Sequence, residues 1–391
     1  MGNRVRNFRI LEALSREFEL TIVTLVHDRR RLEDPGPIAQ LGDWRPVLAS
    51  HRASAGAKFA WHLRARWSRW REGLHAETYF QSLPALAREV ERAVDRVKPD
   101  LVHAAYWYSL RRIRRFPRPP IWVVDTHDVQ YERHARVFGQ VSSREAEQEL
   151  AQLARYDHIL AITAADAATL RTRLGADARI EVAPMGVDLD AWDEGESRPA
   201  LRPALRVGFY GNLSTPANQA AARELLHQVR PAIRAQEFDP EFVLLGATPP
   251  RDLRRLDAVD GVRVPGFVED VRPWLKSMSV LALPLRAGSG QRGRVLEALA
   301  ARVPVVAYPE AIAGLELDGA GITIVTGPTE MAAALIGLLR DDSRRRTCAD
   351  AGRAEVEARY SWSATYGRFP ALYGRWIEEE REPRSDFRGS P

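Results

Sequence analysis

The sequence predicts an α/β protein of two doubly wound, Rossmann-like domains, each built on a parallel sheet. Its 391 residues exceed what one ordinary hydrophobic core needs and suit two domains. Short β-branched runs alternate with longer amphipathic stretches, which is the pattern of βαβ units. A polar, proline-bearing linker without periodicity, within residues 188–204, separates two such series. We therefore expect two domains that face each other across a cleft.

The first series occupies residues 1–187, which we assign to an N-terminal domain. Helix-like stretches lie at 7–18, 83–97 and 145–154, and strand-like runs at 19–26, 100–106, 121–128 and 158–163. Each strand-like run is rich in Val, Ile and Leu, as expected for strands that are buried on both faces. The order of these runs predicts a parallel sheet with helices on its faces.

The second series occupies residues 205–362 and predicts a C-terminal domain of the same kind. Strand-like runs lie at 206–212, 241–247, 261–267, 279–285, 303–308 and 322–325, and helix-like stretches at 217–235, 271–278, 294–301 and 329–342. Another helix is expected at 344–359. Residues 363–391 predict a final helix that returns toward the N-terminal domain, followed by a disordered tail.

Composition narrows the class of protein. No run approaches the roughly 20 apolar residues that a membrane span needs, and the N-terminus lacks an apolar signal core. The single cysteine, Cys348, cannot form an intrachain disulfide, so we expect a cytoplasmic protein. The net charge is +5, and nearly all of the positive charge comes from arginine side chains. It favours anionic small molecules or an anionic membrane surface over nucleic acid.

The stretch GSGQRGRVLEALAARVPVVAY, at 288–308, predicts an anion-binding turn after a central strand. Its glycines precede a helix, whose free N–H groups and positive dipole end favour phosphate. Arg292 and Arg294 can add charge-assisted hydrogen bonds. Glu297, about one and a half turns into the helix, can accept two hydrogen bonds from the diol of a sugar. The alternative is a plain loop and a surface helix with an exposed glutamate.

Two further glycine turns end predicted strands of the C-terminal domain. Gly211 lies between the strand at 206–212 and a helix, in a position that suits phosphate. Gly266 and Phe267 end another strand, where a nucleobase could stack or accept backbone hydrogen bonds. Neither turn has the GxGxxG spacing of nicotinamide-binding proteins. Ordinary turns remain an equally good interpretation of both.

A polar group follows a buried strand of the N-terminal domain. Asp125, His127 and Asp128 lie in IWVVDTHDVQYE, at the end of the strand, where parallel sheets place ligands. Two acids beside a histidine can select its tautomer and raise its pKa. A hydrogen-bonded loop histidine without a ligand is the alternative.

Residues 57–74 have the composition of a basic amphipathic helix. Phe59, Leu63, Trp67 and Trp70 fall on one helical stripe, with arginines beside or opposite it. This pattern is typical of a helix that lies on a membrane surface, so we expect a peripheral contact with the inner face of the membrane. A helix packed on its own domain with a solvated arginine face is the alternative.

Taken in order, these motifs resemble the GT-B glycosyltransferases of family 4. The matching stretches are GNRVRNFRILEALSREFELTIVTL, DTHDVQYERHAR, PMGVDLDAW, VGFYGNLSTPANQAA, GFVEDVRPWL and PLRAGSGQRGRVLEALAARVPVVAY. They extend over almost the whole chain. Within the family, the closest pattern is that of bacterial polysaccharide-type sugar transferases with a GSGxRxKxLEA motif.

The resemblance implies a retaining glycosyltransferase that uses a nucleotide-sugar donor, with no metal and no other cofactor. The C-terminal domain would bind the donor, and the N-terminal domain a glycan or lipid-linked acceptor. Glu297 would bind the donor ribose, and His127 would lie near the transferred sugar. The remaining donor contacts would come from Gly211, Gly266, Phe267, Arg286, Gly288, Ser289, Gly290, Arg292 and Arg294, and those of the acceptor side from Gly2, Asn3, Asp125 and Asp128.

The sequence departs from this family pattern in several places. Ser289 replaces a glutamate that often stands eight positions before Glu297, and GNLSTPANQ lacks the usual arginine and lysine after Gly211. Met185 replaces an asparagine. The family usually begins with an apolar strand, and this chain begins at the loop that follows it. We therefore expect two neighbouring strands with unpaired edges, as in a truncated form of the protein.

Two other functions remain open from the sequence. A nucleotide-sugar epimerase could use the same fold, although it would need acid and base groups in the cleft. A truncated homologue could bind nucleotide without turnover. The sequence does not specify the sugar, the nucleobase or the acceptor.

Overall fold

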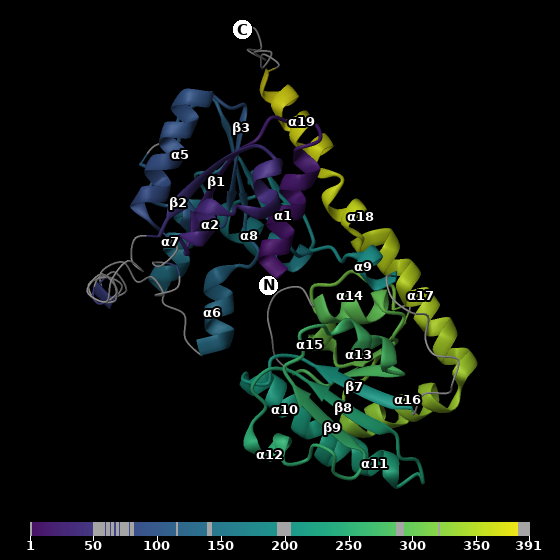
Figure 1. Cartoon of the computed structure of the whole chain (residues 1–391). Coiled ribbons are helices and arrows are strands. Elements are labelled where there is room, and N and C mark those ends of the chain that lie inside the picture. The colour runs from purple at the N-terminus through teal and green to yellow at the C-terminus, as the bar shows by residue number, and fades with distance from the viewer. Residues whose placement is uncertain are drawn as a thin grey trace. The chain divides into compact units, whose positions relative to one another are not determined.

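The computed structural model (Figure 1) describes residues 2–49, 82–114, 116–138, 143–193, 205–286, 293–319 and 321–381, with single positions between 59 and 78. The chain divides into two compact units. The N-terminal unit comprises Met1–Pro184 and Tyr366–Pro391, and the C-terminal unit comprises Met185–Thr365. Both contain parallel sheets between helices, so the predicted fold class is confirmed.

The C-terminal unit contains one continuous sheet of six parallel strands in the order β12-β11-β10-β7-β8-β9. Its strands are β7 (Arg206–Tyr210), β8 (Glu241–Leu245), β9 (Val262–Gly266), β10 (Val280–Leu283), β11 (Val305–Ala307) and β12 (Ile322–Ile324). The central strand β7 pairs with β8 on one side and β10 on the other. This is the doubly wound order, in which the strand order reverses beside the first strand of the unit.

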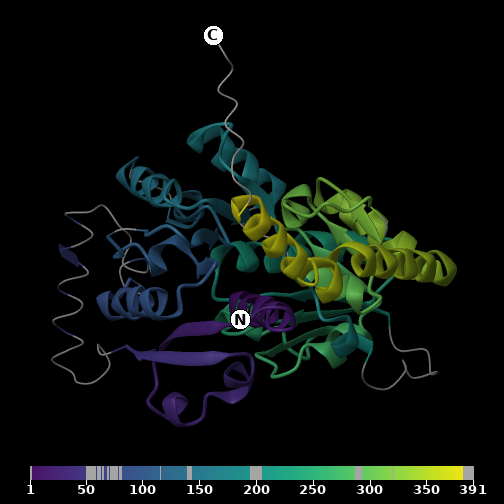
Figure 2. The ribbon, with the colours of Figure 1, turned by 90° about the horizontal axis from the view of Figure 1, so that it is seen from above.

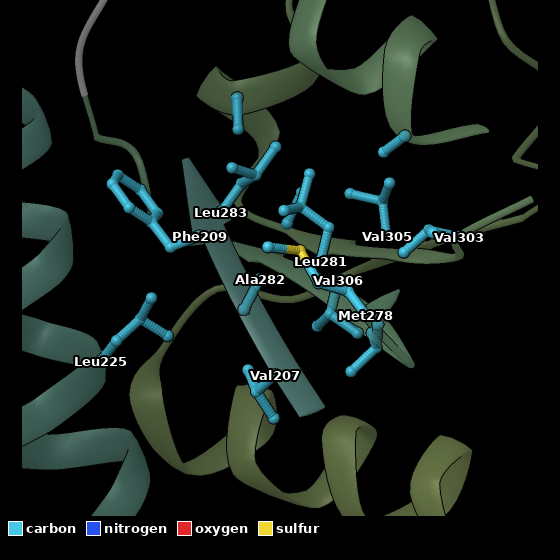
Figure 3. Close-up of a cluster of buried hydrophobic side chains, with 14 of the residues drawn as sticks. Val207, Phe209, Leu225, Met278, Leu281, Ala282, Leu283, Val303, Val305 and Val306 are labelled. Carbon is cyan, nitrogen blue, oxygen red and sulfur yellow. The ribbon is translucent and has the colours of Figure 1, made fainter. Parts of the chain in front are cut away.

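Helices cover this sheet and complete its core. They are α9 (Leu189–Asp193), α10 (Pro216–Glu224), a π-helix (Leu225–Val229), α11 (Arg230–Arg234), α12 (Arg251–Arg254), α13 (Arg272–Ser277), α14 (Gly293–Ala300), α15 (Pro309–Ile312), α16 (Pro328–Arg340) and α17 (Asp342–Tyr360). Figure 3 shows Val207 and Phe209 of β7 packed among side chains of β10 and β11. A β-carbon on Gly208 would lie 1.9 Å from the sulfur of Met278, so a larger residue there would force this fully buried side chain to move.

One part of the predicted linker belongs to this core. Leu189–Asp193 forms α9, and Trp192 is buried in the hydrophobic cluster of the C-terminal unit. An aromatic side chain of this size stabilises the unit when it is buried, so Leu189–Asp193 packs as part of the C-terminal unit rather than as linker. Residues 194–204 lie outside the described residues.

The N-terminal unit has the same kinds of elements but two separate sheets. Its strands are β1 (Thr21–Val26), β2 (Asp43–Leu48), β3 (Leu101–Ala105), β4 (Ile121–Asp125), β5 (His158–Ala161) and β6 (Ile180–Val182). The first two form a parallel pair (Figure 2), and the other four form a parallel sheet in the order β3-β4-β5-β6. Among the described residues, β1 pairs only with β2, and β3 only with β4. Each of these two strands therefore has one edge without a paired strand among the described residues.

The helices of this unit enclose a core of aromatic and aliphatic side chains. They are α1 (Gly2–Leu14), α2 (Arg30–Glu33), α5 (Pro84–Val97), α6 (Gln130–Phe138), α7 (Ser143–Leu153), α8 (Ala164–Leu174) and α19 (Phe369–Arg381), with 3₁₀ turns at Gly36–Gln40 and Trp107–Ser109. Helix α18 (Trp362–Tyr366) precedes α19. α19 lies beside α1 (Figures 1 and 2), and its Trp376 stacks on His158 of β5. Within the described ranges, no helix has the length and apolar character needed to cross a bilayer.

Candidate functional site

The first candidate site lies at the carboxyl end of the sheet in the C-terminal unit. Strand β7 ends at Tyr210 and is followed by Gly211, while α14 presents Arg294 and Glu297 from its first two turns. Because these two side chains are three positions apart on one helix, they lie on the same face. We call Tyr210, Gly211, Asn218, Arg294 and Glu297 the α14 site.

Glu297 is held in this site by a side chain that sequence analysis did not select. The hydroxyl of Tyr210 donates a hydrogen bond to Glu297 Oε2. Burial raises the pKa of Glu297, although the Tyr210 hydroxyl and the nearby Arg294 charge act in the opposite direction. Burial together with the adjacent carboxylate raises the pKa of Tyr210 well above its usual value, so the phenol stays protonated and acts as a donor.

Arg294 packs against the glycine turn after β7. Its Nη1 donates to the carbonyl of Tyr210 and to Asn218 Oδ1, both at 3.1 Å. A β-carbon on Gly211 would lie 2.7 Å from that nitrogen, so the absence of a side chain allows the arginine to reach the backbone. The structure therefore brings together Gly211, Arg294 and Glu297, three of the residues that were predicted separately to contact the donor.

Glycines at the carboxyl ends of β7, β8 and β9, namely Gly211, Gly246 and Gly266, lie at one edge of the sheet. The N–H of Gly211 donates to the carbonyl of Leu245 at 3.0 Å, and that of Gly246 donates to the carbonyl of Gly266 at 2.9 Å. Gly266 has a φ of +80°, which favours glycine, and Phe267 after it is exposed. The structure thus places Gly211 and Gly266 at the carboxyl ends of β7 and β9.

Arg286 is engaged elsewhere in the unit. Its Nη2 donates to Glu224 at 3.0 Å, and its guanidinium lies 4.5 Å from the ring centre of Tyr308. The hydroxyl of Tyr308 also donates to Glu224. Of the other residues predicted to contact the donor, Gly288, Ser289, Gly290 and Arg292 lie outside the described residues.

The second candidate site lies at the carboxyl end of β4 in the N-terminal unit. Asp125, the last residue of β4, is fully buried and forms an ion pair with Arg6 of α1. Arg6 Nε donates to Oδ2 at 2.8 Å, Nη2 donates to Oδ1 at 3.1 Å, and Nη1 donates to the carbonyl of Pro184 at 2.9 Å. Burial alone would raise the pKa of Asp125, but Arg6 and, to a smaller extent, the nearby His127 and His103 together outweigh burial and lower that pKa.

His127 lies next to this ion pair. Its Nε2 is 3.1 Å from Asn7 Oδ1 and 3.8 Å from Asp125 Oδ2. Tyr106, which has a φ of +66°, stacks on the imidazole with ring centres 4.3 Å apart. We call Arg6, Asn7, Tyr106, Asp125 and His127 the β4 site.

The expectation that neighbouring acids raise the pKa of His127 is wrong. Burial lowers this pKa to about 4, because desolvation of the imidazolium outweighs the attraction of Asp125 and because Arg6 adds repulsion. His127 is therefore neutral at physiological pH. It can accept or donate a hydrogen bond, but it has no proton to give as an imidazolium.

The remaining residues predicted for the acceptor side are not part of this cluster. Asp128 lies on the loop before α6, 3.9 Å from Arg133, and is partly exposed. Gly2 and Asn3 belong to the first turn of α1, and their side chains lie outside the described part of the chain.

Sequence analysis missed Arg6, Asn7, Tyr106 and Tyr210. A signal for Arg6 was present: Ile10 and Leu14 follow it at helical spacing and are buried, so position 6 lies on the same buried stripe. A charge on such a stripe needs a buried partner. The pairing of Tyr210 with Glu297, 87 positions apart, had no comparable signal.

Two family models match the chain and together reach both units. The model described as Glycosyltransferase Family 4 matches residues 4–191, and that described as Glycosyl transferases group 1 matches residues 204–341.

Two curated relatives carry names of the same kind. D-inositol 3-phosphate glycosyltransferase 2 of Catenulispora acidiphila is 31% identical over 256 residues, which cover 58% of either chain. A GDP-mannose-dependent monoacylated alpha-(1-6)-phosphatidylinositol monomannoside mannosyltransferase of Corynebacterium glutamicum is 28% identical over 218 residues, which cover 49% of this chain and 55% of that protein. The chain thus matches little more than half the length of these relatives.

Solved structures share the fold over nearly the whole chain. Sucrose-phosphate synthase from Thermosynechococcus elongatus superposes with a TM-score of 0.68 at 18% identity, covering 97% of this chain and 94% of that one. Anabaena HepE in complex with UDP and glucose gives a TM-score of 0.63 at 14% identity, covering 97% and 96%.

Proposed function

Because the chain belongs to glycosyltransferase family 4 and has the GT-B fold, we propose that it is a retaining glycosyltransferase. It transfers a sugar from a nucleotide-sugar donor to an acceptor in glycan or glycolipid synthesis. The observation that carries this proposal is the α14 site, where Arg294 and Glu297 meet the Gly211 turn at the carboxyl edge of a parallel sheet. In such sheets, ligands bind beyond this edge.

The donor contacts follow from the chemistry of these groups. Glu297 accepts hydrogen bonds from the ribose hydroxyls, since a carboxylate has lone pairs for both. Arg294, together with Arg292, Gly288 and Gly290 as the sequence predicts, offsets the charge of the diphosphate. Phe267, which is exposed at the end of β9, provides an apolar face for the nucleobase. The relative from Anabaena was solved with UDP, which supports a nucleoside diphosphate as the leaving group.

Catalysis then consists mainly of charge stabilisation and positioning. The bond between the anomeric carbon and the diphosphate oxygen breaks, and the new bond to the acceptor oxygen forms on the same face of the sugar. The acceptor proton moves to the departing diphosphate, which arginines stabilise as its charge grows. We propose that this needs no metal or other cofactor. His127, which is neutral, contacts the transferred sugar by hydrogen bonding rather than by proton transfer.

A panel of nucleotides tests the donor part of this proposal. Thermal unfolding is followed in UDP, GDP and ADP and in their sugar conjugates, because a ligand that binds only the folded state raises the melting temperature. We expect one nucleobase series to raise it and the others to leave it unchanged. The absence of a shift in every series would contradict donor binding.

The stereochemistry is tested with the sugar nucleotide that binds. Proton NMR of the transfer or hydrolysis product should show the anomeric configuration of the donor in the first product formed. Inversion would contradict the retaining reaction. An epimerised sugar formed without any acceptor would instead support the epimerase, and binding without release of the nucleoside diphosphate would support a non-catalytic homologue.

We also propose a lipid-linked acceptor, reached from the cytoplasmic face of the membrane. Phe59, Leu63, Trp67 and Trp70 are helical and are 68%, 52%, 53% and 79% exposed. Their spacing of four, four and three residues puts large apolar side chains on one stripe, and Arg66 beside them is also exposed. Aromatic and arginine side chains together suit the interface of an anionic bilayer. The named substrate of the Corynebacterium relative is a phosphatidylinositol mannoside, which is a lipid.

Cosedimentation with vesicles tests this contact. The chain should bind phosphatidylcholine vesicles that contain phosphatidylglycerol more strongly than vesicles of phosphatidylcholine alone. The double variant Phe59→Ser, Trp70→Ser should lose most of this binding, whereas Val97→Ser, which removes an exposed apolar side chain on α5, should not. Equal binding by both variants would contradict a membrane role for residues 57–74.

A further inference from the structure

Tyr210 touches both charged residues of the α14 site, through different atoms. Its backbone carbonyl accepts a hydrogen bond from Arg294 Nη1 at 3.1 Å, and its hydroxyl donates to Glu297 Oε2. Tyr210 is the last residue of β7, a central strand of the sheet, and it pairs with Leu245 of β8, while β10 pairs with Val207 and Gly208 earlier in the same strand. One residue at the end of a central strand thus contacts both Arg294 and Glu297 of α14.

The hydrogen bond to Oε2 leaves the second carboxylate oxygen for a ligand. A carboxylate accepts hydrogen bonds at both oxygens, and no described residue other than Tyr210 donates to Glu297 through an identified hydrogen bond. The phenol fixes the plane of the carboxylate and restricts its rotation. We infer that Tyr210 is a positioning residue, which orients Glu297 so that Oε1 receives the ribose hydroxyls of the donor; this rests on the proposed function.

A second consequence concerns the charge of Glu297. Among the residues that the structure describes, the titratable groups that face this carboxyl are the phenol of Tyr210 on β7 and the guanidinium of Arg294 on α14. Burial favours the neutral acid, and a donated hydrogen bond favours the carboxylate. Tyr210 therefore helps to keep Glu297 ionised, which is the form that accepts two hydrogen bonds from a diol.

The variant Tyr210→Phe removes the hydroxyl and keeps the ring. Titration with the nucleoside diphosphate that shifts the melting temperature most should show a dissociation constant about 10-fold higher than for the unsubstituted chain, for one lost hydrogen bond to a charged group. The dissociation constant should also begin to rise at a higher pH as the solution is acidified, because the pKa of Glu297 rises when the phenol is absent. A role limited to packing would not move this pH dependence.

The matched control is Tyr308→Phe. Tyr308 also donates its hydroxyl to a glutamate of the same unit, Glu224, outside the α14 site. We expect the Tyr308→Phe variant to bind the nucleoside diphosphate with the same dissociation constant and the same pH dependence as the unsubstituted chain.

The outcomes separate this inference from the proposed function. If Glu297→Ala weakens binding while Tyr210→Phe changes neither the dissociation constant nor its pH dependence, the inference is wrong and the donor site stands. If the unsubstituted chain binds no nucleotide at all, the proposed function fails and the inference fails with it. If Tyr210→Phe bound the nucleoside diphosphate more weakly but with an unchanged pH dependence, this result would also overturn the role of Tyr210 in orienting and ionising Glu297.

Discussion

The two units of the chain use the same architecture but hold their candidate sites in different ways. In the C-terminal unit, β7 is paired on both sides within a six-stranded sheet, and its last residue touches Arg294 and Glu297. In the N-terminal unit, the strands form a pair and a separate sheet of four, with unpaired edges on β1 and β3 among the described residues. The β4 site is instead tied to α1 by the buried ion pair of Arg6 and Asp125.

This difference predicts that the arginine of one site mainly supports folding and that the arginine of the other mainly supports ligand binding. Arg6 faces a carboxylate in a fully buried position, so its loss would leave an unpaired charge in the core. Arg294 donates to neutral oxygens beside a glycine turn. We therefore expect the N-terminal arginine to matter more for folding and the C-terminal one to matter more for the donor.

The largest effect should come from Arg6→Met. It leaves Asp125 buried and unpaired, which costs about 3–5 kcal/mol in the free energy of unfolding. The matched variant Arg294→Met should cost about 1–3 kcal/mol, because it leaves neutral acceptors without a donor. Urea denaturation of both variants measures these losses, with proteolysis at each urea concentration used to report which unit has unfolded. Equal losses would remove the contrast between the two sites.

The double variant Arg6→Met, Asp125→Leu controls for packing. Replacing both partners removes the unpaired charge, so it should be more stable than Arg6→Met alone. A double variant that is as unstable as the single one would show that the shape of Arg6, rather than its charge, supports the unit.

Acid should destabilise the N-terminal unit by the next largest amount. The pKa of His127 is about 4 in the folded chain and near 6.5 when unfolded, so only the unfolded chain gains a proton between these values. Stability is therefore complete above about pH 6.5 and falls by about 3 kcal/mol as the pH drops toward 4. His158, whose folded pKa is also about 4, acts in the same direction.

The contribution of Glu297 to stability should change with pH in the opposite direction to that of His127. Its pKa is raised in the folded chain, so its contribution to stability is complete below the unfolded value and is lost as the pH rises through the folded value. Denaturation of the two units between pH 7.5 and 5 tests both signs.

The variant His127→Gln should reduce the acid sensitivity of the N-terminal unit. If the free energy of unfolding of this variant fell with acid as steeply as that of the unsubstituted chain, His127 would not be the group responsible.

The smallest expected effect is faster hydrogen exchange at the unpaired edges of β1 and β3, and it can be measured on the unsubstituted chain. Amide protons of β1 and β3 that point away from β2 and β4 should exchange with deuterium faster than those of β7, which is paired on both sides. Exchange measured strand by strand by mass spectrometry should show this order. Equal protection of β3 and β7 would mean that the edge of β3 is covered.

The sequence was sufficient for the fold because its signals are local. Alternation of β-branched runs with amphipathic stretches predicts parallel sheets, and the apolar runs at 121–125 and 280–283 are indeed buried strands. Strand β2 was not predicted, since Asp43–Leu48 contains Pro46 and polar residues. Because β2 pairs only with β1 among the described residues, it has an unpaired edge, which explains why proline is tolerated there.

The sites could be predicted only where their residues are near in sequence. Arg294 and Glu297 share a helix, and Asp125 and His127 share the end of a strand, so spacing alone brings each pair together. Arg6 and Asp125 are 119 positions apart, and their pairing depends on the tertiary fold, which brings α1 to the carboxyl end of β4. The lowered pKa of His127 also depends on burial, which a list of neighbouring acids does not reveal.

The most direct test of the proposed donor site is the binding of a nucleoside diphosphate to Glu297→Ala. Calorimetric titration with the nucleotide that binds the unsubstituted chain should show a loss of about 2 kcal/mol or more, which is about 30-fold in the dissociation constant. Glu357→Ala, which removes an exposed glutamate on α17 of the same unit, should bind as the unsubstituted chain does. Equal affinity of Glu297→Ala and Glu357→Ala would contradict the assignment of the α14 site to the donor.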